Sequence, residues 1–541
     1  MHRLALGALA LFYLTFGLGS YGLLNNNEGL YAEIAREMLE SGSYITPMLD
    51  GVPYLEKPPL LPWLLAGVYA LFGPSELALR AVPACAAVVL IAATTRIARE
   101  HSGAQAAWIT GLILASSVLQ VLIYRTLLPD VLLTASFALA MYFFLRWHAR
   151  RASASLVASY AFLGVAVLAK GFLALVLGPL IFVLFWVWVR PAWRLRELAH
   201  PWALASLLLL SLSWPIAITV QDFDYGWFFV VNEQILRFFA LREPNDYYTG
   251  PLYYYLPRVA LFALPWSLFL PLLAMRRQVT ELEKFAWIWF GACLIFFSLS
   301  LAKANYYMTL GMPALGLLMA LALADAIERE RRWALAALSA FATLVAALAL
   351  WALEERFWMR RPQRIWITIL QLQPELALTL VAVGAIAAIA ALLFALRRNH
   401  AALYGFALAG VPVLAFVLLL VRHAETFISG RALAEYLRSE HPLAKVYLFQ
   451  DYENLSSVPF YLGRQVAIVE SASNDLAFGL REQPKHPNVL SAAEFRTALE
   501  SDEVVLLVHR RRLAAYRAML GGLGLAPRNR VGNVAVFSNY H

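Results

Sequence analysis

The sequence predicts a polytopic α-helical membrane protein that ends in a soluble α/β domain. The first observation is composition. Of 541 residues, 61% are hydrophobic and only 15% are charged, and the mean hydropathy is +0.64. A soluble protein surface requires more charge than this. The second observation is a long series of apolar runs, and the third is a change to an ordinary soluble composition from about residue 426.

The apolar runs before residue 422 have approximately the length that crosses a bilayer. A hydrocarbon layer about 30 Å thick requires roughly 20 residues of α-helix. The runs are 4–24, 77–97, 104–122, 126–147, 154–169, 171–190, 201–220, 257–275, 283–301, 306–325, 332–352, 376–397 and 401–421. We therefore expect about thirteen transmembrane helices within residues 1–425, with polar loops at 25–76 and 221–257.

The arginines indicate which side of the membrane each connection occupies. The formal net charge of +9 could suggest a nucleic-acid partner, but the arginines fall in every second connection, from Arg3 to the Arg397–Arg398 pair. This is the pattern of cytoplasmic loops. We expect a cytoplasmic N-terminus, an outward first loop, an outward C-terminus and no nucleic acid. Four arginines fall on the predicted outer side instead: Arg356, Arg360, Arg361 and Arg364. Either they lie on an interfacial amphipathic turn that faces anionic headgroups, or the helix count is wrong there.

The first polar loop is the expected centre of the chemistry, because it is too polar to cross a bilayer. Within it, 28–39 has apolar residues at helical spacing and predicts an amphipathic helix that lies along the membrane surface. The segment YLEKPP, at 54–59, follows. Its paired prolines favour an extended backbone, which would hold Glu56 and Lys57 at the water boundary.

The acidic residues near the membrane allow two interpretations each. Glu28, after Asn27, could act as a general base at the membrane surface. Alternatively, Asn27 caps the helix and Glu28 meets the positive end of its dipole. Asp130 lies in the first turn of a predicted span, where a carboxylate costs up to about 2.5–3.5 kcal/mol. It therefore faces a cavity or pairs with Arg125.

Cations in the outward connections are candidate anion ligands, because they oppose the positive-inside trend. Three of the six lysines lie there: Lys57, Lys170 and Lys303. Together with Arg237 and the Tyr306–Tyr307 pair, they could converge on a lipid phosphate. The alternative is a set of snorkelling cations with an aromatic belt. The tyrosines at 247–255 form either an interfacial aromatic belt or a platform that binds a sugar.

Residues 426–541 are expected to form an α/β domain on the periplasmic side. The pattern predicts helices at Gly430–His441, 491–501 and 511–521, and strands at Lys445–Phe449, Glu503–Val508 and Val534–Phe537. Alternating helices and strands indicate a small layered domain. It contains no Gly-rich phosphate loop and no metal-ligand spacing, so we assign it no chemistry.

Seven segments carry a resemblance to a known family: NEGLYAEIAREM, DGVPYLEKPPLLPW, RTLLPD, LAKGFLAL, VVNEQILRFF, PLYYYLPRVALFALPW and LAKANYYMTLGMP. Over about residues 5–325 the chain resembles the bacterial C-type membrane glycosyltransferases. It looks most like the aminoarabinose (lipid A) transferases and is more distantly similar to the protein O-mannosyltransferases. The resemblance implies the GT-C fold, about thirteen transmembrane helices, and a polyprenyl-phosphate sugar as the donor.

The resemblance also implies roles for individual residues. Lys57, Arg237 and the tyrosine at 306 or 307 would hold the carrier phosphate, and Asp130 would face the cavity. The expected catalytic residues are Glu28, Asn27 and Asp130. The donor phosphate would be bound by Lys57, Arg237, Lys303, Tyr306 and Tyr307. The supporting residues are Glu56, Tyr54, Arg125 and Lys170.

Two positions depart from the family pattern. Asn27 replaces the usual first aspartate of a catalytic acidic pair, and Leu30 replaces an arginine. Either Glu28 serves as the base, or the acceptor is already anionic, as a lipid A phosphate would be. The departures argue for a different sugar or acceptor.

We therefore expect an inverting glycosyltransferase of the bacterial inner membrane with its active site on the periplasmic face. It would transfer an aminoarabinose-like pentose or a hexose from undecaprenyl phosphate to lipid A or a related glycolipid. The alternatives are a protein O-glycosyltransferase and a non-enzymatic lipid flippase. We expect a monomer among membrane lipids, with no cofactor required; a divalent metal is possible but not indicated.

Overall fold

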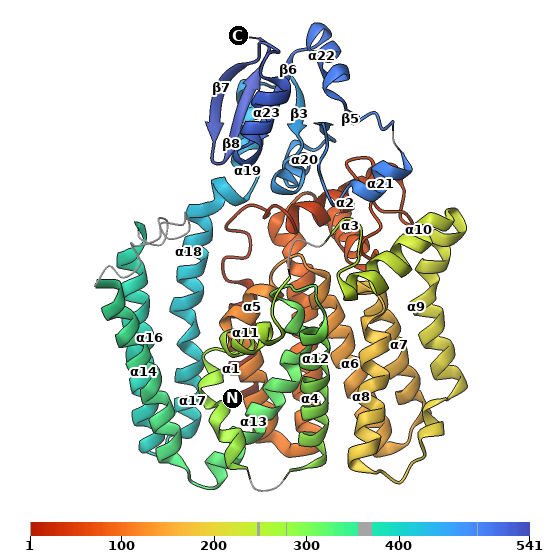
Figure 1. Cartoon of the computed structure of the whole chain (residues 1–541). Helices are drawn as coiled ribbons and strands as arrows, with labels where there is room; N and C mark the ends of the chain where they lie inside the picture. Colours follow the sequence, from red (N-terminus) through yellow and green to blue (C-terminus); the bar gives the residue numbers. More distant parts are fainter. Residues whose placement is uncertain (1, 246–248, 277–278, 355–370, 484, 541) are drawn as a thin grey trace.

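The computed structural model describes residues 2–245, 249–276, 279–354, 371–483 and 485–540. A bundle of long helices is covered at one end by short helices and loops, and an α/β domain lies on that layer (Figure 1). The four arginines that opposed the predicted topology, Arg356, Arg360, Arg361 and Arg364, lie outside the described residues, as do Tyr247 and Tyr248.

The helical bundle contains most of the apolar residues. Its helices are α1 (His2–Thr15), α4 (Glu76–Ser116), α6 (Pro129–Arg150), α7 (Ser153–Lys170), α8 (Leu173–Val189), α9 (Pro201–Gln221), α11 (Tyr255–Phe262), η5 (Trp266–Met275), α12 (Glu281–Leu299), η6 (Tyr307–Gly311), α13 (Met312–Glu328), α14 (Arg332–Glu354), α16 (Gln373–Ala395), α17 (Asn399–Leu408) and α18 (Gly410–Ile428). Nine spans in the described residues are long and apolar enough to cross a membrane, or ten if one bent pair is a single span. The protein is therefore a polytopic helical membrane protein.

The number of these spans differs from the predicted number for three reasons. First, α4 joins the predicted runs 77–97 and 104–122 at Gly103, whose φ of 85° and ψ of −175° break the helix. Glycine adopts such a positive φ readily. Second, α1 and α8 have only 14 and 17 residues. Third, run 257–275 bends by 109° between α11 and η5.

The layer above the bundle comes mainly from the first polar loop and from the long loop after α9. Its elements are α2 (Glu28–Ser41), β1 (Met48–Leu49), β2 (Val52–Pro53), α3 (Leu60–Phe72), α5 (Val118–Tyr124), α10 (Phe223–Trp227), η2 (Phe228–Ile235), η3 (Leu236–Phe239) and η4 (Leu252–Tyr254). η1 (Leu195–Leu198) lies before α9.

Helix α2 is buried on its polar face as well as its apolar face. The helix was predicted to be amphipathic and to lie along the membrane surface, but most of its polar face is covered by protein. Glu33 and Arg36 form an ion pair with side chains 0% and 1% exposed. Glu37 accepts hydrogen bonds from the Gly51 N–H at 2.8 Å and from the Gln465 side chain at 3.0 Å. The β1–β2 turn and the α/β domain therefore replace water over this face.

The α/β domain is built on one six-stranded sheet in the order β5-β4-β3-β6-β8-β7. Its strands are β3 (Lys445–Phe449), β4 (Ala467–Val469), β5 (Val489–Leu490), β6 (Val504–His509), β7 (Ala526–Val531) and β8 (Val534–Ser538). The helices are α19 (Arg431–Glu440), η8 (Glu453–Leu455), α20 (Val458–Leu462), α21 (Ala477–Glu482), α22 (Ala492–Ser501), η9 (Arg510–Arg512) and α23 (Leu513–Leu520). The first four strands in the order are parallel, while β8 runs antiparallel to β6 and β7. All six predicted elements are present; the sequence analysis missed β4, β5 and β7.

The α/β domain holds the first polar loop against the bundle through direct hydrogen bonds. Asn25 Oδ1 accepts from the N–H of Ser457 at 3.1 Å and from its hydroxyl at 2.7 Å. Asp50 Oδ1 accepts from the N–H of Val466 at 2.8 Å. The loop that carries the expected chemistry is therefore fixed from both sides.

Candidate functional site

Five charged side chains from two distant segments form one cluster: Glu56, Lys57, Glu233, Arg237 and Arg242. Lys57 Nζ lies 3.1 Å from Glu233 Oε2, and Arg237 Nη1 lies 2.8 Å from the same oxygen. Arg242 Nε lies 2.8 Å from Glu233 Oε1, and Arg242 Nη2 lies 2.5 Å from Glu56 Oε1. Because three cations meet two carboxylates, the ionised cluster retains one positive charge.

The two carboxylates hold the cations in position. Burial alone would raise the pKa of Glu233, but Lys57, Arg237 and Arg242 outweigh burial and lower that pKa to about 2. Glu233 is therefore ionised at neutral pH. Burial, and then repulsion from Arg237, lower the pKa of Lys57 below the ordinary lysine value. An anion beside Lys57 would offset both effects and favour the charged ammonium.

Local sequence explains how these side chains come together. Glu233 and Arg237 lie four residues apart on consecutive helical turns, η2 and η3, and such pairs face the same side. η2 is a π-helix, a form found frequently at functional sites. Lys57 precedes two prolines and then α3, so its backbone remains outside the helix.

A second ion pair joins two bundle helices beside this cluster. Asp130 lies in the first turn of α6, and the ammonium of Lys170, the last residue of α7, pairs with its Oδ1. Lys170 Nζ also lies 4.3 Å from the ring centroid of Tyr307 and 5.2 Å from that of Tyr306. The sequence alternative, in which Asp130 pairs with Arg125, is wrong.

Arg125 and Lys303 donate to backbone carbonyls instead of forming part of the cationic cluster. Arg125 is 1% exposed and reaches the carbonyl oxygens of Tyr13 at 3.3 Å and Phe16 at 2.5 Å. Lys303 is 3% exposed. Its ammonium donates at 2.8, 2.7 and 2.5 Å to the carbonyls of Phe297, Ser298 and Ser300. Lys303 therefore caps the end of α12, contrary to its predicted role in binding phosphate.

A cavity of about 150 Å³ opens beside the charged cluster. Its polar wall is formed by Lys57, Lys170, Glu233, Arg237 and Tyr307. Its apolar wall is formed largely by Phe172, Leu173, Val176, Phe238, Phe296 and Phe297. Three cations and a phenol on one side of an apolar channel suit an anion attached to a hydrocarbon chain. Among the residues that the structure describes, no three His, Cys, Asp or Glu side chains group to hold a metal ion.

Four predicted residues lie behind this cavity: Tyr54, Glu56, Asp130 and Tyr306. None of them is among its lining residues. Each carboxylate contacts a lysine of the wall: Glu56 Oε2 lies 3.8 Å from Lys57 Nζ, and Asp130 pairs with Lys170. Tyr54 is 4% exposed, and its N–H donates to the Pro47 carbonyl at 2.8 Å.

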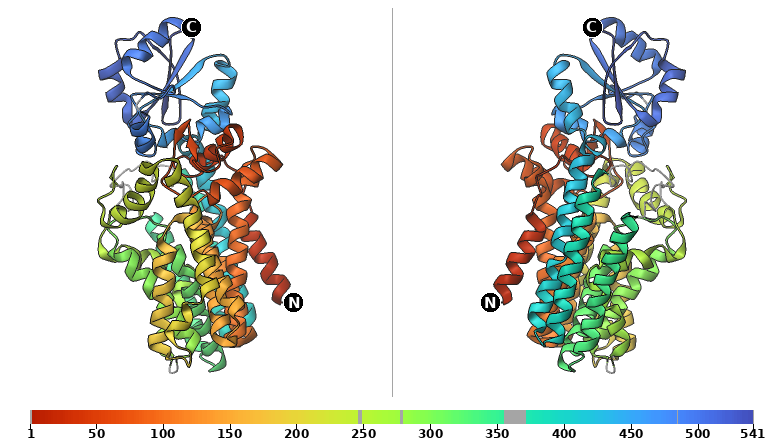
Figure 2. Two further views of the ribbon diagram at one scale, coloured as in Figure 1. Left: turned by 90° about the vertical axis from the view of Figure 1, so that its right-hand side faces the viewer. Right: turned by 90° about the vertical axis from the view of Figure 1, so that its left-hand side faces the viewer.

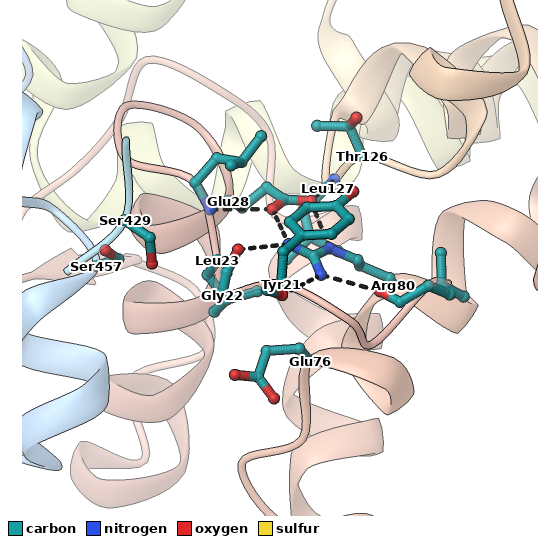
Figure 3. Close-up of polar contacts among 12 residues, drawn as sticks. Tyr21, Gly22, Leu23, Glu28, Glu76, Arg80, Thr126, Leu127, Ser429 and Ser457 are labelled. Carbon is teal, nitrogen blue, oxygen red and sulfur yellow. Dashed lines mark hydrogen bonds and ion pairs between the residues drawn. The ribbon is translucent and has the colours of Figure 1, made fainter. Parts of the chain in front are cut away.

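Glu28 lies in a closed ion pair with Arg80 (Figure 3). Both side chains are 0% exposed, and the guanidinium reaches Glu28 Oε1 at 3.0 Å and Oε2 at 2.5 Å. Oε2 also accepts the Leu24 N–H at 3.0 Å. The expectation of a carboxylate open at the membrane surface is therefore wrong. Asn27 precedes α2, but its side chain makes no capping hydrogen bond.

Three charged residues that organise these sites were not predicted from the sequence: Glu233, Arg242 and Arg80. The spacing of Glu233 four residues before Arg237 was the available signal. Arg80 offered none, because its partner is 52 residues away.

Comparison with known proteins places the whole chain in one structural group. The family model described as dolichyl-phosphate-mannose-protein mannosyltransferase matches residues 11–226. The structure resembles the crystal structure of ArnT from Cupriavidus metallidurans bound to undecaprenyl phosphate, with a TM-score of 0.85 and 26% identity. That match covers 99% of this chain and 98% of the other. The fold is therefore the GT-C fold.

Two curated relatives carry the same functional name, undecaprenyl phosphate-alpha-4-amino-4-deoxy-L-arabinose arabinosyl transferase. The relative numbered 2 from Pseudomonas fluorescens (strain Pf0-1) is 33% identical over 343 residues, which are 61% of each protein. The chain thus spans about three fifths of that relative's length. The relative from Pseudomonas aeruginosa (strain LESB58) is 33% identical over 406 residues, 71% of this chain and 70% of the relative. By this similarity and its shared fold, the chain belongs to the family of the undecaprenyl phosphate-aminoarabinose arabinosyl transferases.

Proposed function

We propose that the protein is an inverting glycosyltransferase that uses undecaprenyl phosphate carrying an aminoarabinose-like sugar as its donor. The cavity carries this proposal: Lys57, Lys170 and Arg237 line it together with a largely apolar set of aromatic and aliphatic side chains. A polyprenyl phosphate combines the same two features, a charged phosphate and a long hydrocarbon chain. The relatives' names and the undecaprenyl phosphate bound to ArnT support the same donor.

The chemistry is a single displacement at the anomeric carbon. An acceptor oxygen attacks, the bond between the anomeric carbon and the phosphate oxygen breaks, and that electron pair leaves on the phosphate. Fixed cations stabilise the departing charge strongly in a site that excludes water. Lys57 and Arg237 supply them, and Glu233 keeps both in place without reorganisation during the reaction.

The acceptor is a phosphate of lipid A or of a related glycolipid. Such an oxygen is already anionic, so transfer requires no strong base. The burial of Glu28 against Arg80 favours this choice over a Glu28 base. Asn27 and Asp130 then position the reactants: the Asn27 side chain makes no capping hydrogen bond to α2, and Asp130 holds Lys170.

The active site faces the periplasm from the bacterial inner membrane. The predicted cytoplasmic arginines support this orientation, with the N-terminus inside, about thirteen membrane-crossing segments and residues 426–541 outside. We propose that the protein acts as a monomer. Lipids surround the bundle.

A protein O-glycosyltransferase is the second candidate. The mannosyltransferase family model that matches residues 11–226 supports it, since such an enzyme would share the donor site and differ in the acceptor.

The deciding experiment is mass spectrometry of lipid A and of membrane peptides from three strains. The strains carry no copy of the gene, the intact gene, or Lys57→Ala. An increment on lipid A that requires the intact gene and Lys57 would establish the acceptor, and its mass would identify the sugar. The exposed Lys445→Ala serves as the matched control and should retain transfer. An increment found on peptides alone would replace the lipid A acceptor with a protein.

A further inference from the structure

A second cavity, which shares no lining residue with the donor cavity, lies against helix α1. Its volume is about 760 Å³, within the range of about 300–1,000 Å³ common for ligand pockets. It is formed by α1, by both halves of α4 on either side of Gly103, and by the start of α17. Figure 2 shows the N-terminal end of α1, in red, slanting away from the bundle at this place.

The cavity has an apolar stem and a cationic end. Gly7, Ala10, Val88 and Ile91 line the stem. Arg96 and Arg99 line the other end. Val88 and Arg99 are eleven residues apart on a helix, which corresponds to about 16 Å. This is a hydrocarbon-sized channel that ends in charge at the arginine-rich end of the bundle.

The two arginines differ in their ion-pair partners. Arg96 pairs with Glu100 at 2.8 Å and is 61% exposed. Arg99 has no hydrogen-bond or ion-pair partner within the part of the chain that the structure describes. Trp108 and His400 also line the cavity, with ring centroids 5.0 Å apart and ring planes tilted by 51°. Arg99 is exposed at the cavity, and an anion bound there would form a direct ion pair with its guanidinium.

We propose that this cavity binds one anionic phospholipid, with its phosphate at Arg99 and an acyl chain along α1 and the first half of α4. Basic pockets between transmembrane helices are suited to anionic lipid headgroups. The site is separate from the donor cavity, because the two share no lining residue. A bound lipid would also fill the space beneath α1, which is fixed at its other end by the Tyr13 hydroxyl on the Ala407 carbonyl at 2.6 Å.

The chain offers a substitution that adds a side chain inside the cavity at a position where the Cβ is unobstructed. A Cβ added at Gly7 would meet nothing within 4 Å, so Gly7→Leu can occupy the stem. Gly291, on α12, is equally open and does not line the cavity. Gly291→Leu is therefore the matched control for adding a leucine to a membrane helix.

Native mass spectrometry of the detergent-purified protein, titrated with phosphatidylglycerol or phosphatidylcholine, tests the site. We expect one phosphatidylglycerol to bind more tightly than phosphatidylcholine, by about fivefold for one arginine. Arg99→Gln should remove this preference, and Gly7→Leu should abolish the bound lipid. Gly291→Leu and the donor-site variant Lys57→Ala should bind it as the natural protein does.

Three results would overturn the proposal. Equal affinities for the two lipids would show that Arg99 does not recognise the anionic headgroup. Retained phosphatidylglycerol in Gly7→Leu would place the lipid elsewhere on the bundle. Displacement of phosphatidylglycerol by undecaprenyl phosphate, dependent on Arg99 and unaffected by Lys57→Ala, would make a polyprenyl phosphate the occupant.

Discussion

Lys57 Nζ lies 3.1 Å from Oε2 of Glu233, although 176 residues separate them in the chain. The same oxygen accepts from Arg237 at 2.8 Å. One carboxylate therefore aligns two cations toward one cavity. The first polar loop and the long loop after α9 meet at this carboxylate, and the donor site requires both.

Substitution of Arg237 should mainly weaken donor binding, whereas substitution of Arg242 should mainly lower stability. Arg237 lines the cavity and its side chain is 23% exposed, so Arg237→Ala should weaken undecaprenyl phosphate binding with little change in stability. The substitution removes a charged hydrogen bond to the phosphate, which corresponds to about 1.5–3 kcal/mol of binding free energy. Arg242 is 6% exposed and does not line the cavity, so Arg242→Ala leaves Glu56 and Glu233 without this partner. We expect the free energy of unfolding to fall by about 3–5 kcal/mol.

Thermal unfolding and binding of labelled undecaprenyl phosphate, measured on both variants, separate these effects. Equal losses of stability in the two variants would contradict a ligand-facing role for Arg237.

Donor binding should weaken as the pH rises, at a lower pH than for an ordinary lysine. Burial and the nearby Arg237 lower the pKa of Lys57 in the free protein. The phosphate requires the charged ammonium, which loses its proton as the pH passes this lowered pKa, so affinity falls on the alkaline side. In Lys57→Arg the guanidinium stays charged throughout. Affinity profiles that remain parallel for the natural protein and Lys57→Arg would exclude Lys57 as the titrating group.

Glu28→Gln should destabilise the fold without removing the chemistry. The substitution leaves the Arg80 guanidinium buried without its carboxylate. Loss of one member of a buried pair typically costs about 3–5 kcal/mol. The double variant Glu28→Gln/Arg80→Gln should lose less than the sum of the single variants, because each single change already breaks the pair. Transfer per folded molecule should persist; a stable but inactive Glu28→Gln protein would restore the catalytic role.

Periodicity and composition predicted the local elements of this protein. Each predicted apolar run overlaps a helix, although run 4–24 is helical only as far as Thr15. The predicted strands Lys445–Phe449 and Val534–Phe537 match β3 and β8 because they consist largely of apolar residues. Strands β4 and β5 have only three and two residues, too short for a pattern. β7 contains a proline and two arginines, which conceal it.

Contacts between distant segments could not be predicted in this way. The polar face of α2 has the pattern of a solvent-facing surface, yet Gly51 and Gln465 cover Glu37 there. Lys303 stood out because its charge opposed the predicted topology, but the carbonyls at the end of α12 satisfy that charge. Lys57 and Lys170 stood out for the same reason, and both line the cavity. The position in the sequence therefore did not distinguish the lysines that line the cavity from the lysine that binds backbone carbonyls.

Gly29→Ala should loosen the α/β domain from the bundle. A Cβ at Gly29 would lie 2.5 Å from both the backbone N and the Cα of Ser457, and this backbone cannot rotate away as a side chain could. Ser457 also donates to Asn25 and accepts from the Gly430 N–H at 2.8 Å, so displacing it disturbs the whole contact. Overpacking of this kind costs about 1–3 kcal/mol.

Hydrogen exchange should therefore accelerate in α2 and α20 of Gly29→Ala, while α13, deep in the bundle, stays protected. Gly67→Ala in α3 is the control, because its added methyl group would meet nothing within 4 Å. Replacing a glycine within a helix there should leave stability unchanged or raise it by up to about 1 kcal/mol. If Gly29→Ala exchanged as slowly as Gly67→Ala, the close approach of α2 to Ser457 would not hold the domain in place. The positions of Glu37 and Asp50 would then have to depend on the β1–β2 turn alone.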